Sequence, residues 1–105
     1  MKPVEVSKVK INKAGELLVR PSMNPDKICR FVYRAAMEVD WSEEEQSFIC
    51  PVPRDWTHFD WYKQVVSAVV SELGILPQIT DKTSWENVSA ALQEAISSYV
   101  YEKST

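Results

Sequence analysis

The chain changes from strands to helices at the stretch THFDWYKQVVSAVVSELG (residues 57–74), which we predict to be a helix. At 100° per residue its apolar side chains form one stripe about 200° wide, so the helical period outweighs the strand preference of its valines. Thr57 has the side chain of an N-cap, Asp60 lies in the first turn, and Gly74 supplies the stop. The stripe is wider than contact with a sheet requires, so we expect a second helix or another subunit beside it.

The sequence before this helix has the pattern of strands. Apolar and polar residues alternate over residues 4–11, and a second short strand at 16–20 follows a turn at 13–15, which predicts a hairpin with a glycine turn. The alternation changes from even to odd positions between Val6 and Val9. We expect a β-bulge between them to keep the apolar side chains on one face.

Residues 29–39 show the clearest alternation in the chain and predict a long, half-buried strand. Residues 47–50 resume an apolar run, and segment 41–46 carries too much charge to be buried. We therefore expect these two strands to pair through an acidic tip. Pro51 and Pro53 then end the sheet, because proline cannot donate a ladder hydrogen bond.

After the first helix we predict a loop over residues 75–82 and a second helix that starts at a capping box, Thr83 and Glu86. We expect this helix to lie beside the first, because Ala91 and Ala95 leave one flank narrow. Its apolar face consists of Trp85, Val88, Leu92, Ala95, Ile96 and Tyr99.

Strands segregated from helices predict a single α+β domain over residues 1–105. Its expected architecture is an antiparallel four-stranded β-meander followed by two helices packed on one face (ββββαα). A parallel sheet is not expected, since its crossovers need helices between the strands and the first three connections are too short. The predicted core comprises Phe31, Tyr33, Met37, Phe48, Tyr62, Val66, Val69, Leu73, Val88, Leu92 and Ile96.

Composition bounds the class of protein. The 105 residues are 45% hydrophobic and 26% charged, as in an ordinary soluble domain. Apolar runs such as Val65-Val66 and Ala68–Val70 are far shorter than the roughly 20 residues of a membrane span, and the N-terminus lacks the apolar centre of a secretory signal. We therefore expect a cytoplasmic protein without membrane contact.

The cysteines and the histidine give no metal site. Cys29 and Cys50 have no close partner in the sequence, so we interpret them as reduced core thiols, with a disulfide possible if their strands are neighbours. A zinc site would need two further ligands, and the single histidine, His58, cannot complete it. We predict no metal and no cofactor.

The net charge of −3 is unevenly distributed. Residues 1–34 hold eight basic and three acidic side chains, and residues 35–105 hold four and twelve. We favour the interpretation that the two parts lie together and complement each other. The alternative is a nucleic-acid-binding protein whose basic sheet face holds phosphates without reading bases. The candidate residues for that face are Lys8, Lys10, Arg20, Arg30 and Arg34.

Segment 54–61 has the densest set of chemically active side chains, where the predicted sheet gives way to the helix. A hydrolytic site would pair His58 with Asp55 or Asp60, but no G-x-S-x-G elbow, phosphate-binding loop or H-E-x-x-H motif accompanies them, so we lean against an enzyme. His58 lies inside the apolar stripe, which predicts a packed, neutral, hydrogen-bonded imidazole. A small-ligand protein would instead show a deep pocket at this junction.

Four tryptophans, at positions 41, 56, 61 and 85, are a large aromatic content for this size of domain. Such residues either close the ends of a core or anchor an interface. We predict a non-enzymatic protein-interaction module whose partner is a second copy of itself or another protein. We favour the homodimer, because a symmetric dimer is the commonest way to hide a surplus apolar surface. The candidate ligand or interface residues are Trp41, Arg54, Trp56, His58, Asp60 and Trp61.

The sequence resembles known groups of proteins in two respects. Residues 33–50, with VDWSEE at 39–44 leading into SFIC at 47–50, resemble the opening hairpin of small antitoxins with a degraded ribonuclease-H-like fold. Those proteins continue through a Pro-Gly loop, which is absent after Pro53, and they would imply a regulatory role. As a compact domain without a catalytic motif, the whole chain is similar to the small proteins of bacterial integron gene cassettes. That group shares no single fold or activity, so the resemblance implies no functional residue.

Overall fold

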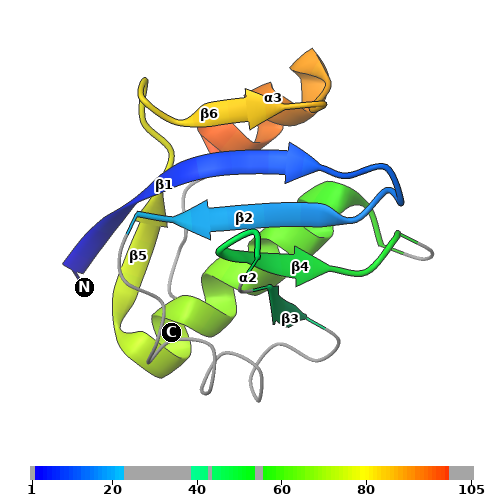
Figure 1. Cartoon of the computed structure of the whole chain (residues 1–105). Coiled ribbons are helices and arrows are strands. Elements are labelled where there is room, and N and C mark those ends of the chain that lie inside the picture. The colour runs from blue at the N-terminus through cyan, green and yellow to red at the C-terminus, as the bar shows by residue number, and fades with distance from the viewer. Residues whose placement is uncertain (1, 23–38, 43, 54–55, 100–105) are drawn as a thin grey trace.

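The computed structural model describes residues 2–22, 39–42, 44–53 and 56–99. In these residues, two helices cover one face of a mixed six-stranded sheet (Figure 1), which confirms the α+β class. No helix among them is long and apolar enough to cross a membrane. The elements are β1 (Lys2–Ile11), β2 (Leu17–Pro21), β3 (Asp40–Ser42), β4 (Ser47–Cys50), α2 (His58–Leu73), β5 (Ile75–Gln78), β6 (Ser84–Glu86) and α3 (Ala90–Ser98).

The first two strands form the predicted antiparallel hairpin, and its register shifts between Val6 and Lys8, which confirms the bulge. The turn depends on Asn12, whose side-chain oxygen accepts hydrogen bonds from the backbone N–H groups of Ala14 (3.0 Å) and Glu16 (2.9 Å). Gly15 completes the turn at φ 91°, a conformation that other residues rarely adopt.

The order of the antiparallel strands differs from a meander. Strand β4 pairs with β2, and β3 lies outside β4 at the edge of the sheet. Phe48 and Cys50 on β4 are buried, whereas β3 carries the exposed Asp40, so the more apolar strand takes the central place. An antiparallel hairpin into β4 is present, but its first strand lies at Asp40–Ser42, so Trp41 and Ser42 of the predicted acidic tip belong to the strand and the turn is shorter than predicted. Most of the strand predicted over residues 29–39, with Phe31, Tyr33 and Met37, lies outside the described residues.

The purely antiparallel sheet is wrong, because β1 has two parallel partners. Its first half, Lys2–Glu5, pairs with β5, and Lys8–Lys10 pairs with β6. The segment after α2 therefore begins with a strand instead of the predicted loop, and Pro77 is tolerated there because β5 is an edge strand. The crossover that a parallel pair requires is supplied by α2, which lies between β4 and β5 in the sequence.

The second helix starts later than the capping-box motif predicts. The Thr83 hydroxyl donates to the Val6 carbonyl at 2.7 Å and accepts from the Thr80 N–H at 2.9 Å, so it is not a cap. Residues 84–86 form β6, and α3 begins at Ala90 with Ser89 as its N-cap. A long-range partner on β1 therefore overrides the local helix signal.

Helix α2 has the predicted bounds and caps. Thr57 and Asp60 form a capping box, in which the Thr57 hydroxyl accepts from the Asp60 N–H at 3.1 Å and the Asp60 carboxylate accepts from the Thr57 N–H at 2.9 Å. Gly74 ends the helix at φ 64°. Helix α3 lies beside it, since the Tyr99 ring meets the rings of Phe59 (5.8 Å) and Tyr62 (6.1 Å) edge to face.

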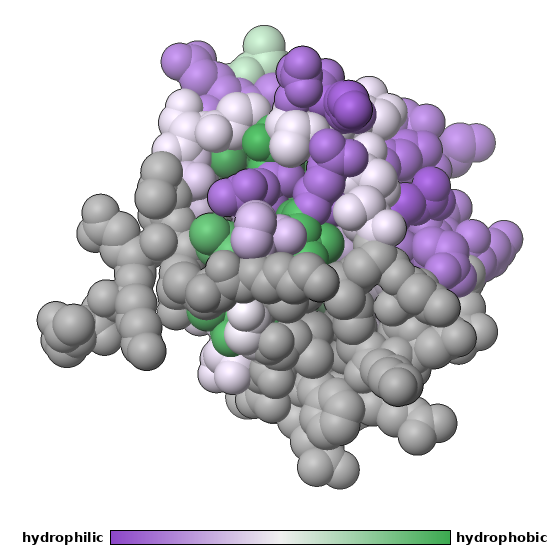
Figure 2. Space-filling view, turned by 90° about the vertical axis from the view of Figure 1, so that its left-hand side faces the viewer, coloured by the Kyte–Doolittle hydropathy of each residue, from purple (hydrophilic) through white to green (hydrophobic). Residues whose placement is uncertain are grey.

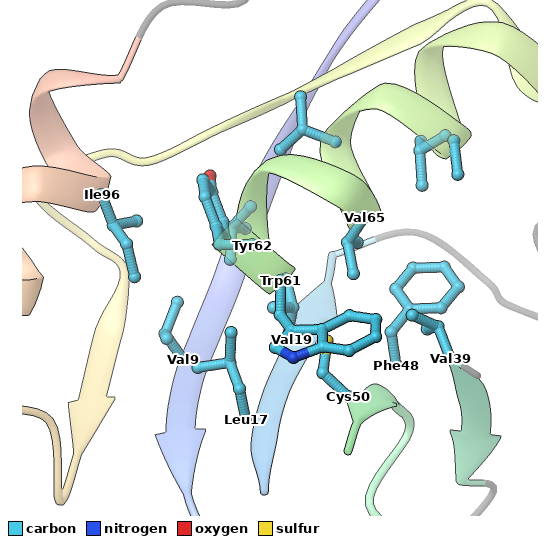
Figure 3. Packing of buried hydrophobic residues seen from close by; sticks show 14 residues of the cluster. Val9, Leu17, Val19, Val39, Phe48, Cys50, Trp61, Tyr62, Val65 and Ile96 are labelled. Atoms are coloured by element: carbon cyan, nitrogen blue, oxygen red, sulfur yellow. The ribbon is translucent and has the colours of Figure 1, made fainter. Parts of the chain in front are cut away.

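The core lies between the sheet and the helices (Figure 3). Register places Val9, Val19 and Phe48 in one row across three strands, facing α2. Of the predicted core, Val88 and Leu92 are partly buried, and the side chain of Leu73 lies outside the described part. The fully packed members of the prediction are Phe48, Tyr62, Val66, Val69 and Ile96.

Candidate interaction site at the sheet-to-helix junction

The β1–β2 turn, the end of β4 and the start of α2 meet at one end of the molecule (Figure 1). Among the described residues, two large hydrophobic side chains are exposed, Val52 (48%) and Trp56 (44%), and both belong to the segment that joins β4 to α2. Single exposed apolar residues are common on protein surfaces, but here they come from one short segment. This end of the molecule is therefore the candidate contact surface.

Trp56 rests on a rigid base. Its ring lies 4.7 Å from the Trp61 ring at an interplanar angle of 51°. Trp61 is 8% exposed and belongs to the same core cluster as Phe48 and Cys50 (Figure 3). Its indole N–H is buried and has no hydrogen-bond partner in the described part of the chain, so packing alone holds this ring. Of the two tryptophans, one belongs to the core and the other covers it from outside.

His58 joins the start of α2 to the hairpin turn. Its Nε2 lies 2.8 Å from the Gly15 carbonyl oxygen, and because that partner is an acceptor, Nε2 is the nitrogen that donates. A Cβ atom at Gly15 would lie 3.7 and 3.9 Å from the two Val52 methyl groups, so Val52 lies close to the same turn. The predicted hydrogen bond of His58 is therefore present, and the side chain is half-buried. We call these five residues, Gly15, Val52, Trp56, His58 and Trp61, the junction patch.

The remaining candidates at the junction have other roles. Asp60 caps the start of α2, and the hydrogen bond from the Thr57 backbone N–H lowers the pKa of the Asp60 carboxyl. The Lys63 ammonium forms an ion pair with the same carboxylate at 3.4 Å. Trp41 lies on β3, where its ring meets Phe48 edge to face at 4.9 Å, so it covers the edge of the core. Arg54 lies outside the described residues.

The predicted basic face is paired with acidic side chains. Lys10 lies 3.0 Å from Glu86 and 3.7 Å from Glu45, and Lys8 lies 3.5 Å from Glu86. The guanidinium of Arg20 donates twice to the Glu45 backbone carbonyl. Hydrogen bonding with Lys10 lowers the pKa of Glu86, and the pKa of Lys10 is raised in turn. Arg30 and Arg34 lie outside the described residues.

The electrostatics of this face support the interpretation of internal complementarity. Lys8 and Lys10 come from the basic first third of the chain, and Glu45 and Glu86 come from the acidic remainder. Three positive and two negative side chains therefore share the outer surface of β1, β2 and β6. In the described part of the chain, no group of three His, Cys, Asp or Glu side chains is placed to hold a metal ion.

Sequence reasoning missed two features of this region. Val52 stands between two prolines, where neither strand nor helix periodicity marks it, and its exposure depends on the position of the hairpin turn. Two hollows in the described part of the chain also lack the predicted lining: one lies between the two helices and β5, and one lies between the β1–β2 turn and the end of β6. Neither is lined by Trp56, His58 or Asp60.

Comparison with known proteins gives one relationship. Residues 5–83 match the family model described as Integron Cassette Protein Hfx_Cass5. A solved structure of the integron cassette protein Hfx_Cass5, from the mobile metagenome of North West Arm Sewage Outfall, is 33% identical over 92% of this chain and 94% of its own, with a TM-score of 0.42. The relationship rests on sequence, because the superposition is too loose to support a comparison of folds. No curated protein matches the chain.

Proposed function

The chain belongs to the Integron Cassette Protein Hfx_Cass5 family, and on that premise we propose that it is a non-enzymatic protein-interaction module whose partner is a second copy of itself. Membership of this family agrees with the resemblance drawn from the character of the whole chain. The family description names a genetic origin and no reaction, so the proposal rests on the chain's own surface.

The observation that carries the proposal is the exposure of both Val52 and Trp56 on the one segment that joins β4 to α2, with the Trp56 ring against the buried Trp61. Tryptophan anchors interfaces because it buries a large apolar area at a low cost in conformational entropy. Trp61 beneath it, and the hydrogen bond from His58 to Gly15, hold the patch in one shape before any partner arrives. A preformed patch loses little freedom on binding.

A second copy is the partner that this patch fits best. It has an aromatic ring and a branched aliphatic side chain on the same short segment, so a twofold axis would place Trp56 of one chain against Val52 of the other. The chemistry of His58 also supports binding over catalysis, since its Nε2 is committed to a backbone carbonyl. The nucleic-acid alternative is weakened by the ion pairs of Lys8 and Lys10.

The test compares two single substitutions that add the same charge to exposed positions. Trp56→Glu places a carboxylate in the junction patch, and Ser67→Glu places one on the exposed side of α2, half a helical turn around from His58. Sedimentation equilibrium of the full-length chain gives the dimer dissociation constant of each variant. We expect Trp56→Glu to raise that constant at least 100-fold and Ser67→Glu to change it less than threefold.

Two outcomes would contradict the proposal. A dimer that Trp56→Glu and Ser67→Glu weaken equally would place the interface elsewhere. Retention of the wild-type chain on DNA at about 50 mM salt, lost by about 200 mM, would favour the nucleic-acid alternative instead. In that case Lys8→Glu would weaken DNA binding more than Ser67→Glu does.

A further inference from the structure

A hollow of about 310 Å³ lies between the two helices and β5, away from the junction patch. The side of the molecule where β5 lies shows apolar side chains gathered among hydrophilic ones (Figure 2). The apolar walls of the hollow come from α2, β5 and α3 and the residues next to them, which meet only in the folded chain. The wall residues are Tyr62, Val66, Leu76, Ile79, Ile96 and Tyr99.

The walls of this hollow select for a neutral, flat molecule. None of its described lining residues is charged. Tyr62 and Ile96 are buried, and the rings of Tyr62 and Tyr99 contact each other edge to face, with centroids 6.1 Å apart, so the two rings form one continuous aromatic wall. Burial keeps the Tyr62 hydroxyl neutral, since its pKa is raised well above the usual range.

The polar groups of the hollow lie at its exposed rim. Gln78 on β5 and Ser97 on α3 both line it, and both are exposed. An amide and a hydroxyl together offer donors and acceptors to one polar group of a guest, whereas the interior offers apolar contact. A guest of this kind would have an apolar body and a polar end.

The volume limits the size of the guest. An apolar cavity of about 150 Å³ is enough to bind benzene, and this hollow is about twice as large. We propose that it is a binding site for a neutral, two-ring aromatic molecule that carries one hydrogen-bonding group, with the rings packed against the wall that Tyr62 and Tyr99 form together and the polar group at Gln78 and Ser97. The site is independent of the proposed dimer.

The test uses 2-naphthol as the neutral probe and 2-naphthoate as a charged probe with the same rings. Both are titrated into the full-length chain at pH 7, and binding is followed by amide chemical shifts. Ser97→Trp fills the rim of the hollow, whereas Ser98→Trp adds the same ring at the next exposed position, which does not line it. Gln78→Trp fills the rim from the β5 side, and it replaces Ser97→Trp in the titrations if that variant does not fold.

We expect saturable binding of 2-naphthol with shifts at Ile79 and Ile96, weakened at least tenfold by Ser97→Trp and less than twofold by Ser98→Trp. The naphthoate should bind at least tenfold more weakly than the naphthol. Absence of saturable binding, equal effects of the two serine substitutions, or equal affinity for the charged probe would each overturn the proposal. The dimer constant measured for Trp56→Glu does not depend on any of these results.

Discussion

Cys50 shows how burial alone changes a side chain's chemistry. It lies in the core on β4, and burial raises the pKa of its thiol from 9.0 to about 12. The described part of the chain places no cation beside it, so the thiol stays protonated and packs as a small apolar group. A catalytic cysteine instead needs a lowered pKa, a neighbouring positive charge and access to solvent.

This burial predicts a loss of stability at alkaline pH. Below pH 9 the thiol is protonated in both the folded and the unfolded chain. Above that value the unfolded chain loses the proton first, so the free energy of unfolding falls by up to about 1.4 kcal/mol per pH unit as the pH rises from 9 toward 12. Urea unfolding at pH 7, 9 and 10 checks this in a Cys29→Ser background, with Cys50→Ala as the comparison. Equal slopes above pH 9 with and without Cys50 would contradict it.

Thr83 is the residue that joins the β5–β6 connection to the bulge in β1. It is buried, and its hydroxyl satisfies both the Val6 carbonyl and the Thr80 N–H. Thr83→Val keeps the shape but leaves both backbone groups unpaired, so we expect a loss of about 2–3 kcal/mol in urea unfolding. Thr80→Val removes a half-buried hydroxyl that donates to Glu5 and accepts from the exposed Lys82 N–H. Because water can replace these partners at the surface, it should cost about 1 kcal/mol. An equal cost for both substitutions would show that Thr83 has no special role.

At the scale of elements, β6 is attached to β1 by charge as well as by backbone pairing. The Glu86 carboxylate faces Lys8 and Lys10, and its pKa is lowered, first by the hydrogen bond with Lys10. A lowered pKa in the folded chain stabilises it above the unfolded value of 4.5, and this contribution is lost as the pH falls through the folded value. The pairing is half exposed and therefore sensitive to salt.

We therefore expect Glu86→Gln to be less stable than the wild type at pH 7 and to lose less stability between pH 5 and pH 3. Thermal melting across that range, at low and high salt, measures both effects. Glu94→Gln, an equal change of charge at an exposed position of α3, provides the control. If the pH profile of Glu86→Gln follows that of the wild type, the ion pairs do not stabilise β6.

The elements that the sequence predicts well are those whose signals are local. The hairpin, its bulge and α2 follow from alternation, a glycine turn and a capping pair within a few residues of one another. Strands β5 and β6 have four and three residues, too few for a period, and their partner is β1 at the other end of the chain. The Thr83–Glu86 capping box predicts a helix start wrongly for the same reason, since the Thr83 hydroxyl donates to the distant Val6 carbonyl instead of capping a helix.

The candidate site shows the same division between local and long-range information. The density of aromatic residues around 54–61 indicates the junction, and His58 makes a hydrogen bond as predicted. The contribution of Gly15 and Val52 depends on the hairpin turn and the end of β4 meeting in space. The hollow beside β5 could not be predicted, because it is formed by a strand that the sequence pattern does not mark.

At the scale of the whole molecule, one core contains most of the apolar side chains of the described part, and Lys8 and Lys10 on its outer face form ion pairs with Glu86. The exposed part of the junction patch, Val52 and Trp56, is the apolar surface that this arrangement leaves open among the described residues. The proposed dimer would cover this exposed apolar surface.

The measurement that tests the proposed dimer most directly is sedimentation equilibrium of the unmodified full-length chain from about 1 to 200 µM, at physiological salt. The chain mass is 12.1 kDa. We predict a concentration-dependent mass that reaches twice this value, with one dissociation constant describing all concentrations. A mass that stays at 12.1 kDa up to the highest concentration would contradict the proposal, because the junction patch would then be an exposed surface with no second copy to cover it.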